Sequence, residues 1–112
     1  MKIEKYRFGE ITVDGKVYNH DVVLVGGEVR RWVRKESHNV LWEEVSPLLD
    51  FEPEVIIVGT GSGGVMGVSP EIVSKLRERG VEVIVERTGR AVEIYNKISK
   101  EKRVAAVLHL TC

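Results

Sequence analysis

The sequence of 112 residues contains a single cysteine, Cys112, and no glutamine. One thiol excludes an internal disulfide and a cysteine-rich zinc site, two features that often stabilise a small domain. A single thiol also fits a reducing compartment, so we expect a cytoplasmic protein. The absence of glutamine, beside many Glu, Lys, Arg and Val residues, is typical of heat-adapted proteins, which favour charge networks and avoid labile amides. We therefore expect a thermophilic source.

Long apolar runs and an excess of either charge are also absent. No run approaches the roughly 20 apolar residues that span a bilayer, and residues 1–6 alternate apolar and charged side chains as a strand does, unlike a signal peptide. The 17 basic and 17 acidic residues give a formal charge of zero, which leaves no overall attraction to nucleic acid or to an anionic membrane. We expect neither partner, and the weak self-repulsion allows a monomer or a homodimer.

The first third of the chain predicts an antiparallel β-meander. Apolar and polar residues alternate in several short runs, which the tight-turn signals Asp14-Gly15 and Gly26-Gly27 separate. The expected strands cover residues 3–13 (broken at Gly9), 17–18, 21–25 and 28–34. A polar connection precedes a short helix over residues 41–49, which Pro47 limits because proline suits only the first turn of a helix.

The second half of the chain predicts strands that alternate with helices. Val55–Val58 is a continuous β-branched run, typical of a strand buried on both faces. Ser69-Pro70 is the usual order of N-cap and first helical residue, Gly80 is a helix terminator, and Thr88 is the expected cap of a second helix. The expected elements are strands 55–58, 81–86 and 103–110 and helices 70–79 and 89–99. This alternation favours a parallel or mixed sheet with right-handed crossovers, so we predict one α/β domain over residues 1–112.

A set of residues spread along nearly the whole chain matches one known family. The matching residues are Phe8-Gly9-x-Ile11, Gly15, Tyr18, Trp32, Val58–Gly61, Thr88, Ala91, Tyr95-Asn96, Arg103-Val104 and His109–Cys112. They resemble the Mth938-domain family, which includes the adipogenesis-associated Mth938-domain protein of animals and a mitochondrial complex I assembly factor. The resemblance implies a three-layer fold around a central mixed sheet with flanking helices, no established enzymatic activity, and action through protein partners. We expect no mitochondrial presequence, so the complex I role is not carried over.

Gly59, Gly61 and Gly64 spell G-x-G-x-x-G, the dinucleotide-binding fingerprint. In such folds the third glycine lies in the helix that receives the pyrophosphate, whereas here Val65–Val68 separate it from the expected helix. Glu86 ends the next strand about where a ribose-binding acid belongs, but the chain has only half of a two-lobed nucleotide fold. We therefore favour a glycine-rich turn that lets chain segments pack closely, and we expect no cofactor.

A small-anion pocket is a second candidate site. Parallel strands would bring Gly59–Gly61 and Arg87-Thr88 to one edge of the sheet, where ligands of open α/β sheets bind. Arg87 and Arg90, near a helix N-terminus, could hold a carboxylate or phosphate; alternatively, Thr88 is only a cap and the arginines are solvated. The candidate pocket residues are Gly59, Thr60, Gly61, Arg87, Thr88, Tyr95 and Asn96.

The ending His109-x-x-Cys112 predicts neither a metal site nor a catalytic thiol. Positions three apart on a strand face opposite sides, His20 and His38 have no ligand spacing, and no base is placed beside the thiol. We expect His109 to make an ordinary hydrogen bond. The basic run Arg30–Lys35 combines cations with an aromatic ring, as nucleic-acid sites do. Outward arginines on an edge strand also prevent aggregation, and we favour that interpretation.

Two functions remain open. The first is a non-enzymatic protein-interaction or assembly-type factor with an unknown protein partner, which an exposed apolar patch on the meander would favour. The second is a small anionic-ligand-binding protein or enzyme with its site at Gly59–Gly61 and Arg87-Thr88, which a deep, partly polar concavity there would favour. We favour the first function, and therefore expect no catalytic residues.

Overall fold

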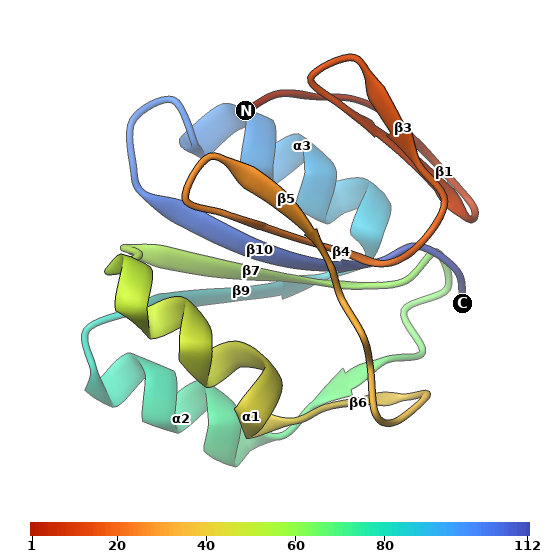
Figure 1. Cartoon of the computed structure of the whole chain (residues 1–112). Coiled ribbons are helices and arrows are strands. Elements are labelled where there is room, and N and C mark those ends of the chain that lie inside the picture. Colours follow the sequence, from red (N-terminus) through yellow and green to blue (C-terminus); the bar gives the residue numbers. More distant parts are fainter.

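The computed structural model describes all residues, 1–112, and arranges them in three layers (Figure 1). The strands are β1 (Ile3–Arg7), β2 (Glu10–Val13), β3 (Lys16–Tyr18), β4 (Val22–Val25), β5 (Glu28–Arg31), β6 (Asn39–Val40), β7 (Val55–Thr60), β8 (Gly67–Val68), β9 (Glu82–Glu86) and β10 (Val104–His109). The helices are α1 (Trp42–Val45), the 3-10 helix η1 (Ser46–Phe51), α2 (Pro70–Glu78) and α3 (Thr88–Ile98).

The middle layer is a mixed sheet in the order β5-β4-β10-β7-β9. One outer layer contains α3 and the small sheet β1-β2-β3, and the other contains α1, η1, α2 and the β6–β8 pair. The expected three-layer α/β fold is therefore confirmed. No helix is both long enough and apolar enough to cross a membrane.

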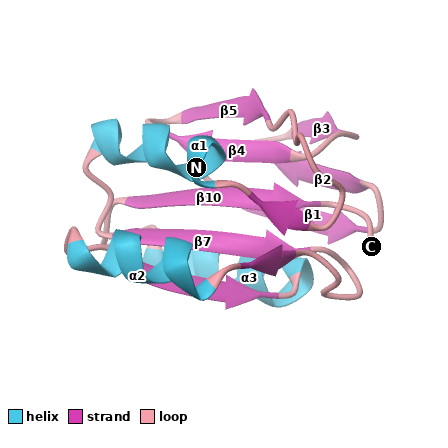
Figure 2. Ribbon diagram, turned by 90° about the horizontal axis from the view of Figure 1, so that it is seen from below, coloured by secondary structure: helices cyan, strands magenta, loops and turns pink.

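Strands β7 and β10 lie at the centre of the middle sheet. β7 runs parallel to both β10 and β9, whereas β4 pairs antiparallel with β10. Every residue of β7 is buried because the outer layers cover both faces, and this explains the uninterrupted β-branched run Val55–Val58. The arrows of β5, β10 and β7 point the same way in Figure 2. We call the edge where these strands end the carboxyl edge.

Side chains of β7 alternate between two apolar cores. Ile56 and Val58 belong to the core against α1 and α2, and Val55 and Ile57 belong to the core against α3 and the small sheet. Fully burying one such side chain contributes roughly 1.5–3 kcal/mol. The two cores therefore hold the outer layers to the sheet and fix the geometry of its carboxyl edge.

The expected meander forms with its predicted turns but is divided between two sheets. Asp14 and Gly15 have φ of 49° and 81°, and Gly26 and Gly27 have φ of 59° and 76°, as type I′ hairpin turns require. β1, β2 and β3 pair only with one another, whereas the β4–β5 hairpin joins the middle sheet through β10. Turn residues specify a local hairpin, but they carry no information on a pairing with a distant segment.

The helices follow the sequence signals with two corrections. Ser69 caps α2 as predicted, its Oγ accepting the Ile72 N–H at 3.3 Å, and Gly80 follows the helix with φ of 80°. The expected helix over 41–49 is instead the single turn α1 followed by η1, because Pro47 breaks the α-helical hydrogen-bond ladder. The expectation that Thr88 caps α3 is wrong. Arg87 is the N-cap and Thr88 is the first helical residue.

The β6–β8 pair was not predicted. Asn39 and Val40 pair in parallel with Gly67 and Val68, and two-residue strands are too short to show a periodicity in sequence. This pair anchors the chain between the glycine-rich segment and α2.

Candidate functional site

The glycine loop, Gly61–Gly64, packs against the chain's own residues Thr111 and Cys112. Ser62 donates its N–H to the carbonyl of Thr111 at 2.6 Å, and Val65 donates to the carbonyl of Cys112 at 3.1 Å. Gly61 has φ of 102°, and a Cβ there would lie 2.6 Å from the carbonyl carbon of Cys112. The backbone that holds a phosphate in dinucleotide folds is therefore packed against protein here, which confirms the expected close-packing turn.

Thr88 ties the glycine loop to the end of β10. Its buried hydroxyl accepts the Gly61 N–H at 2.9 Å and donates to the carbonyl of His109 at 2.5 Å. Thr60 makes a similar link, donating its hydroxyl to the carbonyl of Glu86 at 3.1 Å. The polar groups of Thr60, Gly61 and Thr88 are thus used to bind the ends of β7, β9 and β10 together.

Close packing of neighbouring side chains explains why two further positions are glycine. A Cβ on Gly59 would meet the Leu108 side chain at 2.8 Å, and a Cβ on Gly64 would lie 3.1 Å from Cγ of Arg87. Arg87 therefore lies along the glycine loop. Arg90, in the first turn of α3, forms an ion pair with Glu93, with its Nη1 3.8 Å from Oε2.

Tyr95 and Asn96 lie away from these residues. Asn96 clamps β1 onto α3, because its Oδ1 accepts the Ile3 N–H at 2.9 Å and its Nδ2 donates to the Ile3 carbonyl at 2.7 Å. Tyr95 is buried, which together with the charge of Asp14 raises the pKa of its phenol. The structure thus brings together Gly59–Gly61, Arg87 and Thr88, but not the last two candidate residues.

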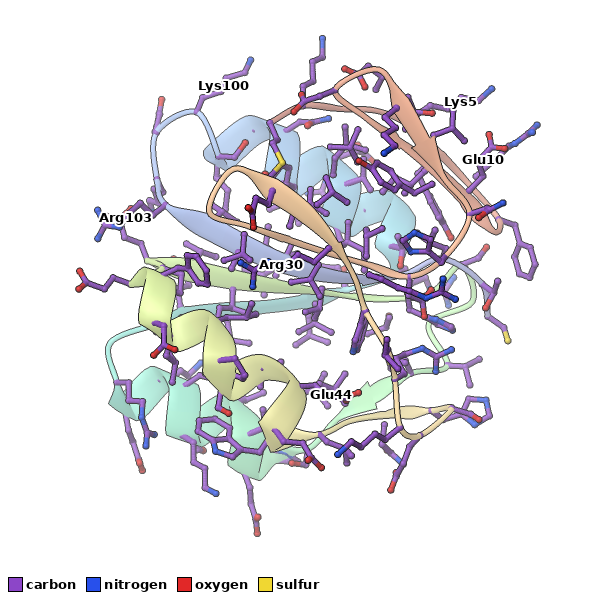
Figure 3. The ribbon with its side chains drawn as sticks, viewed as in Figure 1. Lys5, Glu10, Arg30, Glu44, Lys100 and Arg103 are labelled. Atoms are coloured by element: carbon purple, nitrogen blue, oxygen red, sulfur yellow. The ribbon has the colours of Figure 1, made fainter.

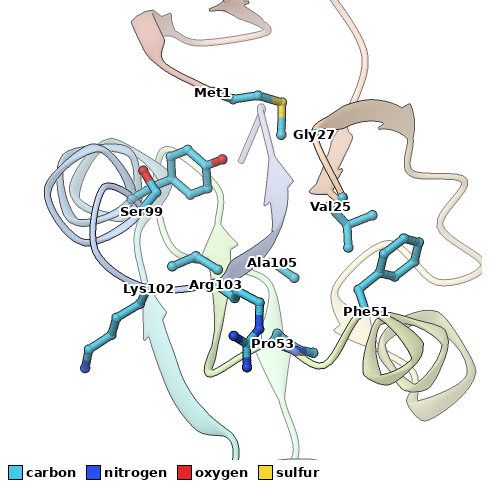
Figure 4. Close-up of a pocket in the computed structure, with 12 residues that line it drawn as sticks. Met1, Val25, Gly27, Phe51, Pro53, Ser99, Lys102, Arg103 and Ala105 are labelled. Carbon is cyan, nitrogen blue, oxygen red and sulfur yellow. The ribbon is translucent and has the colours of Figure 1, made fainter.

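Tyr95 instead lines a cavity near the opposite edge of the sheet (Figure 4). The cavity has a volume of about 250 Å³ and lies between Met1, Phe51 and the start of β10. This volume is below the roughly 300–1,000 Å³ of typical ligand pockets. Arg30 extends from β5 toward this side of the molecule, with its guanidinium 5.2 Å from the ring centre of Phe51 (Figure 3).

A polar cluster that the sequence did not reveal lies at the carboxyl edge, on the β4 side of β10. Asp21 Oδ2 accepts the Nδ1–H of His109 at 2.8 Å and the Nε–H of Arg34 at 2.5 Å. Asp21 Oδ1 accepts the Leu110 N–H at 2.8 Å. The side chains of Asp21 and His109 are only 12% and 3% exposed. His109 therefore makes the expected hydrogen bond, and its partner is the buried carboxylate of Asp21.

These contacts determine the protonation of Asp21. Burial alone would raise the pKa of its carboxyl, but the hydrogen bonds from His109, Leu110 and Arg34 outweigh burial and hold the pKa below its usual value. The carboxylate is thus ionised and fully engaged with donors of the protein itself.

A cleft of about 430 Å³ opens beside this cluster. It is lined by Gly9, Asn19, His20, Asp21, Arg31, Trp32, Val33, Arg34, Leu110 and Thr111. We call it the Arg31 cleft. It lies at the sheet edge where the sequence placed a pocket, but beside β4 and β5 rather than beside β9. No three His, Cys, Asp or Glu side chains come close enough to hold a metal ion, and Cys112 is an exposed free thiol.

Comparison with solved structures defines the class of fold. A conserved hypothetical protein of Pyrococcus horikoshii OT3, PH1505, superposes with a TM-score of 0.91 at 32% identity over 100% of both chains. A protein of Bordetella pertussis, described as a Mth938-like domain, superposes with a TM-score of 0.75 over 97% of this chain and 85% of that one. At 21% identity the second likeness shows the fold alone. The domain is thus Mth938-like.

The chain belongs to the family described as protein of unknown function (DUF498/DUF598), whose model matches residues 3–109. The mouse protein NADH dehydrogenase (ubiquinone) 1 alpha subcomplex assembly factor 3 is 27% identical over 109 residues. That match covers 91% of this chain and 56% of the mouse protein, so the chain spans about half the length of that curated relative. The resemblance to the Mth938-domain family is confirmed.

Proposed function

We propose that this chain is a non-enzymatic, assembly-type factor that binds another protein through its carboxyl edge. The observation that carries the proposal is a set of exposed apolar side chains around Leu110–Cys112. Phe8, Val33 and Val65 are 64%, 72% and 51% exposed. Exposed apolar side chains at one edge of a small protein favour an interaction site there.

Backbone bonds and a shared cleft place the three residues near the segment Leu110–Cys112. Gly9, next to Phe8, donates its N–H to the carbonyl of Leu110 at 2.8 Å, and Val65 bonds to Cys112. Val33 lines the Arg31 cleft together with Leu110 and Thr111. Two of the three residues, Phe8 and Val33, come from the first third of the chain, where an exposed patch was expected to favour this function. The mouse relative is named as an assembly factor, which supports the same proposal.

The alternative site at Gly59–Gly61 and Arg87-Thr88 has less support. Its amide and hydroxyl groups at Gly61 and Thr88 are paired within the chain, and a ligand would have to displace those bonds. Leaving either buried group unpaired costs about 1–3 kcal/mol.

Site-specific crosslinking in the native cell tests the proposal. A photoreactive phenylalanine analogue replaces Phe8 or Val33, and the matched control carries it at Val17, which is 56% exposed on β3. We expect the same discrete protein adduct from positions 8 and 33 and none from position 17. No adduct at positions 8 and 33, or identical adducts at position 17, would contradict a docking surface at the carboxyl edge.

The proposal includes a cytoplasmic location, a thermophilic source and a monomeric or dimeric state, without nucleic-acid or membrane partners. The supporting observations are the single cysteine, the absence of glutamine and the balanced charge. A melting temperature in the ordinary mesophile range, about 45–65 °C, would count against the thermophilic source. Sedimentation analysis of the purified chain decides the oligomeric state.

A further inference from the structure

Three arginines near the end of β5 have different surroundings. Arg30 bonds to Glu28 at 3.0 Å, and Arg34 bonds to Asp21. The side chain of Arg31 makes no hydrogen bond and no ion pair within the protein, although it lines the Arg31 cleft. Its strand partner is Val22, a member of the core against α3, so Arg31 lies on the face of the sheet opposite Arg30. An unpaired guanidinium beside a cleft is free to bind an anion.

The charge balance of the cleft also favours an anion. Asp21 is its one carboxylate, and that carboxylate already accepts bonds from His109, Leu110 and Arg34. Arg34 is fixed in turn, because its Nη1 donates to the carbonyls of Glu36 and Ser37 at 3.0 and 2.8 Å. The Nη2 of Arg34 has no acceptor within the protein. The cleft therefore offers two guanidinium groups and no free carboxylate.

Between the two arginines the cleft is built on buried residues. Trp32 and Leu110 are 6% and 1% exposed, and Trp32 donates its indole N–H to Glu44 at 3.3 Å. The guanidinium of Arg34, which its own bonds already hold, loses little entropy on binding. The planar fork of either arginine matches the two oxygens of a carboxylate or phosphate.

We propose that the Arg31 cleft binds the carboxylate or phosphate group of a small molecule. Arg31 supplies the bidentate contact, and Arg34, positioned by Asp21, supplies the second cation. The cleft shares Val33 with the proposed docking surface, but anion binding does not depend on the docking function. The polar lining and the volume of about 430 Å³ suit a compact, multiply charged anion.

Two-dimensional NMR titration of the full chain tests the proposal, with inorganic phosphate and citrate as probes and sodium chloride at matched ionic strength as reference. We expect saturable shifts at the amides of residues 19–21, 31–34 and 110–111, and none at Gly61–Gly64. Arg31→Ala should weaken binding about tenfold or more, whereas the matched control Arg30→Ala should leave it within about twofold. Because Arg31 is exposed and unpaired, its variant should melt like the parent protein.

The result that overturns the proposal is an absence of saturable shifts with both probes, or an equal loss in the two arginine variants. Shifts with phosphate alone assign a phosphate site, and shifts with citrate alone assign a carboxylate site. A third arm uses a short peptide rich in glutamate. If only the peptide produces saturable shifts, the small-molecule assignment is wrong and the cleft belongs to the protein-docking surface.

Discussion

The glycine loop and the Arg31 cleft lie at the same edge of the middle sheet, and they differ in what their polar groups contact. The amides of Gly61, Ser62 and the adjoining Val65 are paired with Thr88, Thr111 and Cys112. The cleft, by contrast, contains a guanidinium without a partner in the protein. A glycine motif indicates only that the backbone packs closely against another group, and here that group is the chain's own backbone at Thr111 and Cys112. We therefore base the ligand proposal on the unpaired charge beside the cleft and not on the glycine motif.

Replacing Gly61 by Ala should give the largest loss of stability. The new Cβ would lie 2.6 Å from the Cys112 backbone at a φ of 102°, so strain and overpacking should together cost about 4 kcal/mol. Chemical denaturation measures the free energy of unfolding. Gly63→Ala is the matched control, because its Cβ would meet nothing closer than 3.9 Å. Equal losses in the two variants would show that the loop is not packed as described.

Replacing Asp21 by Asn removes the carboxylate that His109 and Arg34 share, which should cost about 3 kcal/mol at pH 7. The folded protein lowers the pKa of Asp21, so the carboxylate stabilises the fold above the unfolded pKa. That contribution is lost as the pH falls through the folded pKa. Urea denaturation should therefore show that the difference in the free energy of unfolding between parent and variant becomes smaller below about pH 4.

The control for this experiment is Asp50→Asn, an exposed aspartate without a hydrogen-bond partner. Its free energy of unfolding should stay within about 0.5 kcal/mol of the parent at pH 7. If the stability difference between Asp21→Asn and the parent stays constant from pH 7 to pH 3, the assigned bonds of the Asp21 carboxylate to His109 and Arg34 are contradicted.

Thr88→Val keeps the shape of the side chain but removes the hydroxyl between Gly61 and His109. Both buried groups lose a partner, so we expect a loss of about 2 kcal/mol in the free energy of unfolding. Thr88→Ser, which keeps the hydroxyl, should recover most of it. Thermal melts at one pH compare the three proteins, and a Val variant as stable as the Ser variant would refute the bridging role.

Cys112→Ser should give the smallest effect, within about 0.5 kcal/mol. The thiol is exposed, and the glycine loop contacts the Cys112 backbone, which the substitution preserves. The same thermal melt checks this expectation. A clear loss of stability would mean that the sulfur itself packs against the loop.

The fold was largely predictable because its signals are local. The β-branched run Val55–Val58 specified a doubly covered strand, and Ser69-Pro70 specified the start of α2. The pairing partners of the strands were harder to predict, since the β4–β10 contact joins segments at opposite ends of the sequence. The divided meander follows from that one long-range pairing.

The candidate sites show the same limit. Gly59, Gly61 and Thr88 were identified because a glycine cluster and a helix start are local patterns. The cluster of Asp21, Arg34 and His109 has no sequence spacing, since the three side chains meet only when β4 pairs with β10. Arg31 was considered only as one of several arginines on an edge strand, and the sequence could not show that it alone lacks a partner.

Amide hydrogen exchange tests the central claim, that the glycine loop packs against the chain's own Thr111 and Cys112. The amides of Gly61, Ser62 and Val65, which donate to Thr88, Thr111 and Cys112, should exchange slowly. Gly63, whose amide has no acceptor in the protein, should exchange fast and serves as the internal reference. Exchange of all four amides at the rate of an unstructured peptide would contradict the account, because it would leave the loop open to a ligand.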